Sequence, residues 1–188
     1  MYGRYGKRVL DILLAAAALF LFAPLMLITA LAIRVCDGAP ILFRQKRVGQ
    51  NEYLFEIRKF RSLPIDTGDV PSAQAATLKP TKIGKLIRRT NIDELPQLIN
   101  ILNGEMSAVG PRPALSSQEQ LLAARRANGA MTCRPGLTGL AQINSYDNMP
   151  EAEKARRDGE YAARITFVRD CKIILRTLRY LTKPPPVY

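Results

Sequence analysis

The first feature of the hydrophobic pattern is an uncharged apolar run from Ile12 to Ile33, long enough for a helix that spans a bilayer core. Pro24 lies near its middle, where the missing N–H and the bulk of the ring should kink or break the helix. Basic residues flank the run on both sides, so neither end is an obvious outside end. The run predicts either one kinked transmembrane helix or two half-helices that form a re-entrant hairpin. A cleaved signal peptide is a third interpretation, because Ala30-Leu31-Ala32 resembles a cleavage site.

The rest of the chain alternates between strand-like and helix-like patterns. Two β-like runs, residues 41–43 and 53–57, lie on either side of the turn residues Gly49-Gln50-Asn51 and predict a hairpin. The stretch 62–80 is rich in Pro, Gly, Ser, Thr and Asp, which is typical of a long loop. The glycine-punctuated stretch 134–143 predicts extended backbone. Apolar residues at helical spacing predict helices in four stretches: residues 83–87, 95–102, 118–127 and 161–181.

The last of these stretches is the clearest helix. One stripe collects its apolar side chains, and arginine and lysine residues lie around that stripe. A basic amphipathic helix either packs its apolar face on a protein core or lies in the headgroup layer of a membrane. The pattern leaves both interpretations open. The stripe consists of Phe167, Cys171, Ile174, Leu178 and Leu181.

Composition narrows the chemistry. The formal net charge of +12 favours anionic partners, such as nucleic acid, acidic lipid or a phosphorylated substrate. An aromatic content of 7% without tryptophan supplies few side chains for stacking on bases. The absence of histidine excludes Ser-His-Asp and Cys-His nucleophile systems and histidine-containing zinc motifs. The three cysteines are far apart, which indicates a reducing compartment and no disulfide framework. Proton or metal chemistry must therefore use Asp, Glu, Lys, Arg and backbone groups.

The stretch TNIDELPQL, residues 90–98, places the carboxylates of Asp93 and Glu94 side by side. Pro96 is favoured in the first turn of a helix, so the helix should begin near Asp93, with both acids interacting with its dipole. The same helix end could bind a phosphoryl group together with Arg88, with Mg²⁺ offsetting the repulsion between carboxylate and phosphate. A carboxylate could then attack phosphorus, and the arginines and the metal would keep its pKa low.

A second motif, GEMSAVGPRP at residues 104–113, contains an acid, Glu105, and places Arg112 between two prolines. The prolines restrict the backbone, so the guanidinium loses little entropy when it binds. Its planar fork matches the oxygens of a phosphate group. Without other evidence, the motif could equally be a surface turn with one solvated arginine.

Taken in order, these motifs resemble those of the monotopic phosphoglycosyl transferases. These are the bacterial sugar transferases that begin glycoconjugate assembly on a polyprenol phosphate. The resemblance covers nearly the whole chain, and its specificity comes from the order and spacing of the motifs. It rests on KRVLD (7–11), the apolar run broken at Pro24, FRQKRVG (43–49), RKFRSL (58–63), DELPQL (93–98), GEMSAVGPRP (104–113) and RPGLTGLAQ (134–142).

The resemblance implies a covalent mechanism. Asp93 would attack the β-phosphate of a UDP-sugar, expel UMP and form a phosphosugar-aspartyl intermediate. The polyprenol phosphate, undecaprenyl phosphate in bacteria, would then attack this intermediate. Glu94 would act as a metal ligand or as a base. Mg²⁺ is implied as cofactor, with Asp93, Glu94 and Glu105 as the metal-site residues.

The resemblance also implies the substrate-binding residues. Lys59, Arg88 and Arg112 would hold phosphate oxygens, and Pro111 and Gln142 belong to the same expected site. The transferred sugar is left open, although family frequency favours an N-acetylated one.

The resemblance further implies the topology. The expected fold is α+β, with a re-entrant membrane hairpin at residues 1–36 and a small cytosolic α/β catalytic domain at 37–188 that carries amphipathic interfacial helices. Lys7, Arg8 and Asp11 would anchor the hairpin at the headgroups, with its break at Pro24. A local ion pair among Lys7, Arg8 and Asp11 is the simpler account of those three residues. The expected location is the cytoplasmic face of the bacterial inner membrane. The length of the chain fits the minimal catalytic form.

Two departures from the family pattern affect these expectations. The family usually has serine before the membrane proline, and here the residue is Ala23. The family often has Asn-Gly-Arg after the glutamine of the RPG motif, where this chain has Asn144-Ser145-Tyr146. Two other functions remain as alternatives: a membrane-tethered nucleic-acid-binding protein and a membrane scaffold. The family implies no nucleic-acid partner, and a homodimer is left open.

Overall fold

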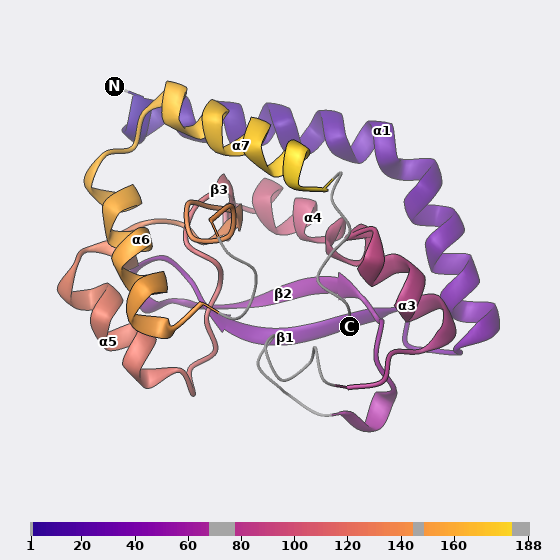
Figure 1. Cartoon of the computed structure of the whole chain (residues 1–188). Coiled ribbons are helices and arrows are strands. Elements are labelled where there is room, and N and C mark those ends of the chain that lie inside the picture. The colour runs from indigo at the N-terminus through magenta and orange to yellow at the C-terminus, as the bar shows by residue number, and fades with distance from the viewer. Residues whose placement is uncertain (1, 68–77, 145–148, 182–188) are drawn as a thin grey trace.

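A long N-terminal helix lies along one side of a small α+β domain (Figure 1). The computed structural model describes residues 2–67, 78–144 and 149–181. Part of the predicted loop 62–80 and the departure at Tyr146 lie outside these ranges. The main elements are α1 (Lys7–Cys36), β1 (Leu42–Val48), β2 (Leu54–Phe60), α3 (Lys82–Arg89), α4 (Gln97–Leu102), β3 (Ser107–Val109), α5 (Glu119–Ala127), β4 (Gly136–Thr138), α6 (Glu151–Ala163) and α7 (Phe167–Leu181).

Helix α1 is continuous through Pro24 and bends along its course (Figure 1). The predicted separation into two half-helices is therefore wrong at the level of secondary structure. A helix tolerates an internal proline by bending away from the unpaired carbonyl rather than by ending. Most side chains in the middle of α1 are exposed, and Phe20 is 87% exposed. By length and composition alone, α1 could cross a membrane.

The β1–β2 hairpin is antiparallel, and its register sets Leu42 opposite Phe60. The predicted hairpin is confirmed, but both strands extend beyond the predicted runs 41–43 and 53–57. Polar residues such as Lys46 continue β1 because backbone pairing with β2 does not depend on the polarity of outward side chains.

Helix α4 packs on β2 through the buried side chain of Asn100. Its amide donates to the carbonyl of Glu56 at 2.8 Å and accepts from the backbone N–H of Arg58 at 3.1 Å. These two bonds pair backbone groups of β2 with a side chain, as a neighbouring strand would pair them, and they hold α4 against β2. The site residues that precede α4 are therefore held at a set distance from β2.

A short parallel pair, β3 and β4, connects the two motifs that surround the predicted site. The backbones approach so closely that a Cβ on Gly136 would lie 2.1 Å from the nitrogen of Gly110. Only glycine fits this position, and the same close approach of the two backbones explains Gly110 and Gly139. The extended backbone predicted at 134–143 is confirmed only in part, because β4 covers Gly136–Thr138 and the chain turns from Leu140 onward. The pattern gave no sign that residues 107–109 pair with β4.

The predicted helix 161–181 is confirmed from Phe167 to Leu181 as α7, but its start at Tyr161 is wrong, because Tyr161 belongs to α6 and a break separates the two helices. Arg164 is extended, with φ −148° and ψ 85°. Tyr161, at the end of α6, donates its hydroxyl to Asp170 of α7 at 2.8 Å. The apolar stripe of the predicted helix begins at Phe167, so the stripe itself agrees with α7, and only the predicted start at Tyr161 lies before the break.

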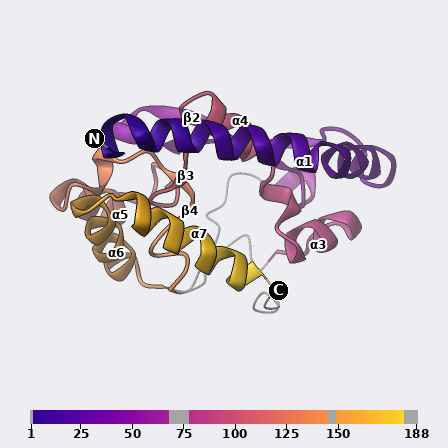
Figure 2. The ribbon, with the colours of Figure 1, turned by 90° about the horizontal axis from the view of Figure 1, so that it is seen from above.

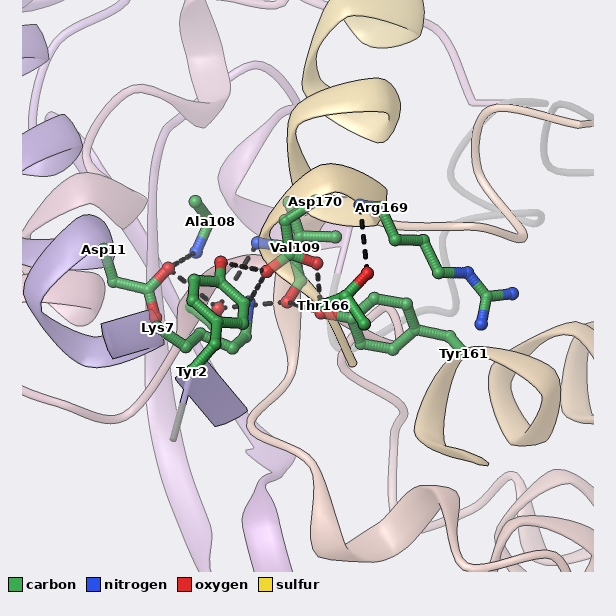
Figure 3. A network of polar contacts seen from close by, with 10 residues as sticks. Tyr2, Lys7, Asp11, Ala108, Val109, Tyr161, Thr166, Arg169 and Asp170 are labelled. Carbon is green, nitrogen blue, oxygen red and sulfur yellow. Dashed lines mark hydrogen bonds and ion pairs between the residues drawn. The ribbon is translucent and has the colours of Figure 1, made fainter. Parts of the chain in front are cut away.

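The N-terminal ends of α1 and α7 lie together, and the two helices then diverge (Figure 2). Figure 3 shows the polar network that joins them. Tyr2 and Lys7 each donate to one carboxylate oxygen of Asp170 at 2.7 Å, while Tyr161 binds the other oxygen. Asp170 is 1% exposed, so its charge depends on these partners.

Two other charged residues of the KRVLD motif, Arg8 and Asp11, also contact the domain. Arg8 donates to the carbonyls of Ile101 and Leu102 at 2.5 and 2.8 Å, which caps the C-terminal end of α4. Asp11 accepts from the hydroxyl of Ser107 and the N–H of Ala108, both at 2.9 Å. Lys7, Arg8 and Asp11 thus bind the domain rather than one another, and the predicted local ion pair is wrong.

Candidate active site

Asp93 lies in a short 3₁₀ turn, Ile92–Glu94, that precedes α4. The turn follows Asn91, which adopts the left-handed conformation with φ 55°. Helix α4 begins only at Gln97, after Pro96. The prediction that this helix begins near Asp93 is therefore wrong, and Asp93 does not cap it. Asp93 is 9% exposed, and it lines a cavity of the domain.

Glu94 is the acceptor for two cations from distant parts of the chain. Lys59 of β2 lies 2.6 Å from its Oε1, and Arg112 lies 2.9 Å from the same oxygen. The Glu94 side chain is only 18% exposed, so both pairs are partly shielded from water. Lys59 can reach it because successive residues of β2 point to opposite faces, and Arg58 points the other way.

The two carboxyl groups have pKa values on opposite sides of their ordinary range. Burial, with the neighbouring charge of Glu94, raises the pKa of Asp93 to about 6, against the opposing effect of Lys59, Arg88 and Arg112. Burial also acts against the ionised form of Glu94, but Arg112 and Lys59 outweigh it and hold the pKa of Glu94 well below its usual value. The sequence predicts that the arginines and the metal keep the pKa of Asp93 low. The cations of the chain do not achieve this, because burial outweighs Lys59, Arg88 and Arg112, and the contribution of the metal stays a prediction.

The two acids line a cavity of about 990 Å³ that has a polar region and an apolar region. The expected residues Lys59, Arg88, Arg112 and Gln142 line it as well. Both amide atoms of Gln142 are buried without a hydrogen-bond partner among the described residues. Apolar side chains of the diverging helices α1 and α7 complete the wall: Leu14, Ala18, Ile174 and Leu178.

Two expected site residues lie elsewhere. Glu105 accepts from Asn100 at 2.7 Å and lies 3.6 Å from Arg58, so it is held on the face of β2 opposite Lys59. It is not among the cavity residues. Pro111 also does not line the cavity; its carbonyl accepts from the N–H of Gly136 at 2.8 Å. The structure thus joins Asp93 and Glu94 but separates Glu105 from them.

Few carboxylate side chains near the cavity are therefore available to bind a divalent cation. Within the described residues no group of three His, Cys, Asp or Glu side chains could hold a metal ion. Two adjacent carboxylates nevertheless fit Mg²⁺, which is commonly bound by one or two carboxylates together with substrate phosphates and water.

A family model described as "Bacterial sugar transferase" matches residues 2–184. The chain belongs to the bacterial sugar transferase family. The match includes α1 as well as the catalytic domain, so the apolar helix is part of the family unit.

Named relatives support this membership. A UDP-glucose:undecaprenyl-phosphate glucose-1-phosphate transferase of Caulobacter vibrioides is 41% identical over 97% of this chain and 72% of the relative. The exopolysaccharide production protein PSS of Rhizobium leguminosarum is 40% identical over 92% of each chain. A transferase of the same name as the first, from Escherichia coli K12, is 39% identical over 93% of this chain but only 40% of its own length.

Several further basic residues of this bacterial sugar transferase line the cavity, although the sequence motifs did not predict them as site residues. They come from strand β1, from the residue directly after β2, and from helices α5 and α6. The first two of them lie within the motifs FRQKRVG and RKFRSL, which carried the resemblance but gave no role for their arginines. The missed residues are Arg47, Arg61, Arg125 and Lys154.

Proposed function

We propose that the protein transfers a sugar phosphate from a UDP-sugar to undecaprenyl phosphate and releases UMP. A carboxylate oxygen of Asp93 attacks the β-phosphorus, the bond to the bridging oxygen breaks, and UMP leaves with that oxygen. The lipid phosphate then attacks the same phosphorus. This second step breaks the Asp93–phosphorus bond, frees the carboxylate and gives a polyprenyl-diphosphosugar.

The electrostatics of the site support Asp93 as the nucleophile. Lys59 and Arg112 both contact Glu94, whereas burial is the strongest influence on Asp93 and raises its pKa. With a pKa of about 6 it is mostly ionised at neutral pH, yet it is a better nucleophile than a strongly stabilised carboxylate would be. Arg112 and Arg88 line the same cavity, where they can stabilise the charge of the transferring phosphoryl group.

The observation that carries the proposal is the continuity of the cavity. It joins the carboxylates to the apolar side chains of α1 and α7, including Leu14 and Leu178. A nucleotide sugar needs the polar region, and the first isoprenyl units of a lipid phosphate need the apolar one. A site for both substrates next to a membrane helix follows from this arrangement.

Mg²⁺ is proposed as cofactor, held by the carboxylates of Glu94 and Asp93 with oxygens of the diphosphate. When bound, it would neutralise charge on the diphosphate and so lower the repulsion felt by the attacking carboxylate. Glu94, whose pKa is strongly lowered, stays ionised throughout the working pH range and suits a ligand better than a base.

We propose that the sugar is glucose. The relatives from Caulobacter vibrioides and Escherichia coli are named for UDP-glucose, against the N-acetylated sugar favoured by family frequency. The product would then enter exopolysaccharide synthesis, as the name of the Rhizobium leguminosarum relative indicates for that protein.

We also propose that α1 is re-entrant and that the domain faces the cytoplasm. Both ends of α1 bind the same domain. Arg8 binds the end of α4, and at the other end Arg61 donates to the carbonyls of Asp37 and Gly38 at 2.6 and 2.8 Å. A helix that crossed the bilayer would have to break one set of these bonds. Bending within one leaflet keeps both.

The reaction is tested by UMP release from a panel of UDP-sugars with undecaprenyl phosphate and Mg²⁺. Wild type should release UMP with UDP-glucose, and Asp93→Asn should show no release above background. Intact-mass spectra of wild type with UDP-glucose alone should show a hexose-phosphate adduct that Asp93→Asn lacks. Turnover by Asp93→Asn equal to wild type would rule out this nucleophile.

The topology is tested by labelling in intact membrane vesicles of known orientation. Cys36 is exposed at the end of α1 and is a natural labelling position. A membrane-impermeant maleimide should modify Cys36 and a cysteine introduced at Tyr5 from the same side. Modification from opposite sides would show that α1 crosses the bilayer.

A further inference from the structure

The segment Pro111–Ala114 is held to the domain by its carbonyl groups. Pro111 and Pro113 have no N–H, so this segment cannot be fixed by a regular hydrogen-bond ladder. Instead, four consecutive carbonyls each accept from a different donor. The outer two receive backbone N–H groups: Gly136 donates to Pro111 at 2.8 Å, and Val48 donates to Ala114 at 2.9 Å.

The inner two carbonyls receive guanidinium groups instead. Nη1 of Arg125, from α5, donates to the carbonyl of Arg112 at 3.0 Å. Nη1 of Arg47, from β1, donates to the carbonyl of Pro113 at 3.3 Å. Both arginines are at least nine-tenths buried. Burying a charged group costs desolvation free energy, so these contacts are less favourable than hydrogen bonds from water to an exposed carbonyl would be.

The charge of Arg125 is balanced by Asp158, which does not itself line the cavity. Asp158, on α6, is 1% exposed and accepts from Nε and Nη2 of Arg125 at 2.9 and 2.6 Å. The two donors point along one edge of the guanidinium, so Nη1 is left aimed at Arg112 in a fixed direction. Helices α5 and α6 thus define the position of the Arg112 backbone.

The side chain of Arg112 leads from this fixed backbone to the carboxylates. Its Nη2 lies 2.9 Å from Oε1 of Glu94, and its charge also acts on Asp93. We propose that Asp158 and Arg125 are positioning residues for the reaction: they fix the backbone of Arg112 so that its guanidinium remains beside Glu94 and the transferring phosphoryl group. The inference rests on the proposed function and adds two residues, from α6 and α5, to the machinery that serves it.

The decisive test is a double-mutant cycle on the full chain in detergent or nanodiscs. Arg125→Gln should lower kcat for UMP release about 10- to 100-fold, the range expected when a charged group is displaced by about an ångström. In an Arg112→Gln background the same change should cost about threefold or less, because the group that it positions is already absent. Asp158→Asn should behave like Arg125→Gln in both backgrounds, and Arg125→Lys should be intermediate.

The next residue of the same helix provides a matched control. Arg126 forms an exposed pair with Glu52 at 2.8 Å and does not reach the cavity. Arg126→Gln should leave kcat unchanged in both backgrounds. If Arg125→Gln lowers kcat by the same factor with and without Arg112, its role is general stability and the proposal is wrong. It is also wrong if Arg125→Gln leaves kcat unchanged.

A measurement without substrate separates this proposal from the proposed function. Amide hydrogen exchange of the peptide that contains residues 110–115 should become faster in Arg125→Gln and Asp158→Asn, but not in Arg126→Gln. Unchanged exchange would overturn the proposal even if the enzyme is active. Absence of UMP release by wild type would refute the proposed function, while faster exchange would still support the fixation of Arg112 by Arg125.

Discussion

The carboxyl groups of Asp93 and Glu94 are adjacent in the chain but have opposite electrostatic surroundings. Glu94 accepts from Lys59 and Arg112, whereas Asp93 is buried beside the negative charge that those cations stabilise. When neighbouring environments push two pKa values apart, the two groups can take different chemical roles. In the proposed mechanism, the acid with the raised pKa would be the nucleophile, and the acid with the lowered pKa, which contacts Lys59 and Arg112, would hold the metal.

The pH dependence of turnover should report the ionisation of Asp93. Because its pKa is raised to about 6, kcat/KM for UMP release should fall as pH decreases through about 6. Glu94→Gln removes a negative neighbour and leaves Lys59 and Arg112 able to approach Asp93. The acidic limb of the profile should therefore move to lower pH in this variant, although its rate at neutral pH is reduced. A limb that stays in place or moves to higher pH would contradict this arrangement.

Asp93→Asn should stabilise the folded protein at neutral pH. The pKa of Asp93 is raised from 3.8 to about 6, so the folded state binds its proton more tightly than the unfolded state does. Wild-type stability should consequently decrease as pH rises from about 4 to about 6, by on the order of 3 kcal/mol. Denaturant unfolding at several pH values should show Asp93→Asn more stable at pH 7, with the difference disappearing near pH 4.

Glu94→Gln is the matched comparison, and its effect should have the opposite sign. The pKa of Glu94 is lowered, so its ionised form stabilises the fold above the ordinary value of 4.5, and that contribution is lost on acidification. At neutral pH, Glu94→Gln should therefore be less stable than wild type. Equal shifts of the two variants in the same direction would refute the assignment of the two environments.

Arg8 should contribute to stability through the end of α4. Arg8→Ala removes the donors to the carbonyls of Ile101 and Leu102 and should lower the free energy of unfolding by about 1–3 kcal/mol. Arg34→Ala, at an exposed position in the last turn of the same helix, is the control and should change it by less than about 0.5 kcal/mol. If thermal unfolding in detergent shows equal losses, Arg8 does not act as a cap.

Asp170 should be essential for attaching the N-terminus to α7. Asp170→Ala leaves Lys7, whose side chain is 12% exposed, without its counter-charge and should cost about 3–5 kcal/mol. Glu160→Ala removes only a half-exposed pair with Arg169 and should cost at most about 1 kcal/mol. Proteolysis near Tyr2 should also become faster in Asp170→Ala only. Similar stabilities of the two variants would show that the network in Figure 3 does not anchor α1.

Much of the catalytic cavity could be predicted from motifs, since Lys59, Arg88, Arg112 and Gln142 line it with the two acids. The resemblance implies Glu105 as a further residue of the metal site. Its direction depends on the packing of α4 on β2, which no pattern revealed. The sequence pattern also did not predict the break between α6 and α7, where the backbone turns at Arg164 just before the apolar stripe begins at Phe167.

The sequence by itself determined the chemical means and the place of the reaction. Without histidine, phosphoryl chemistry has to use the acids and cations, and the uncharged run around Pro24 places them near a membrane. Tertiary structure decided which of the two acids is paired with cations. Lys59 and Arg112 reach Glu94 from 35 and 18 residues away. Burial and charge–charge energies depend on distance in space, so adjacency along the chain could not distinguish Asp93 from Glu94.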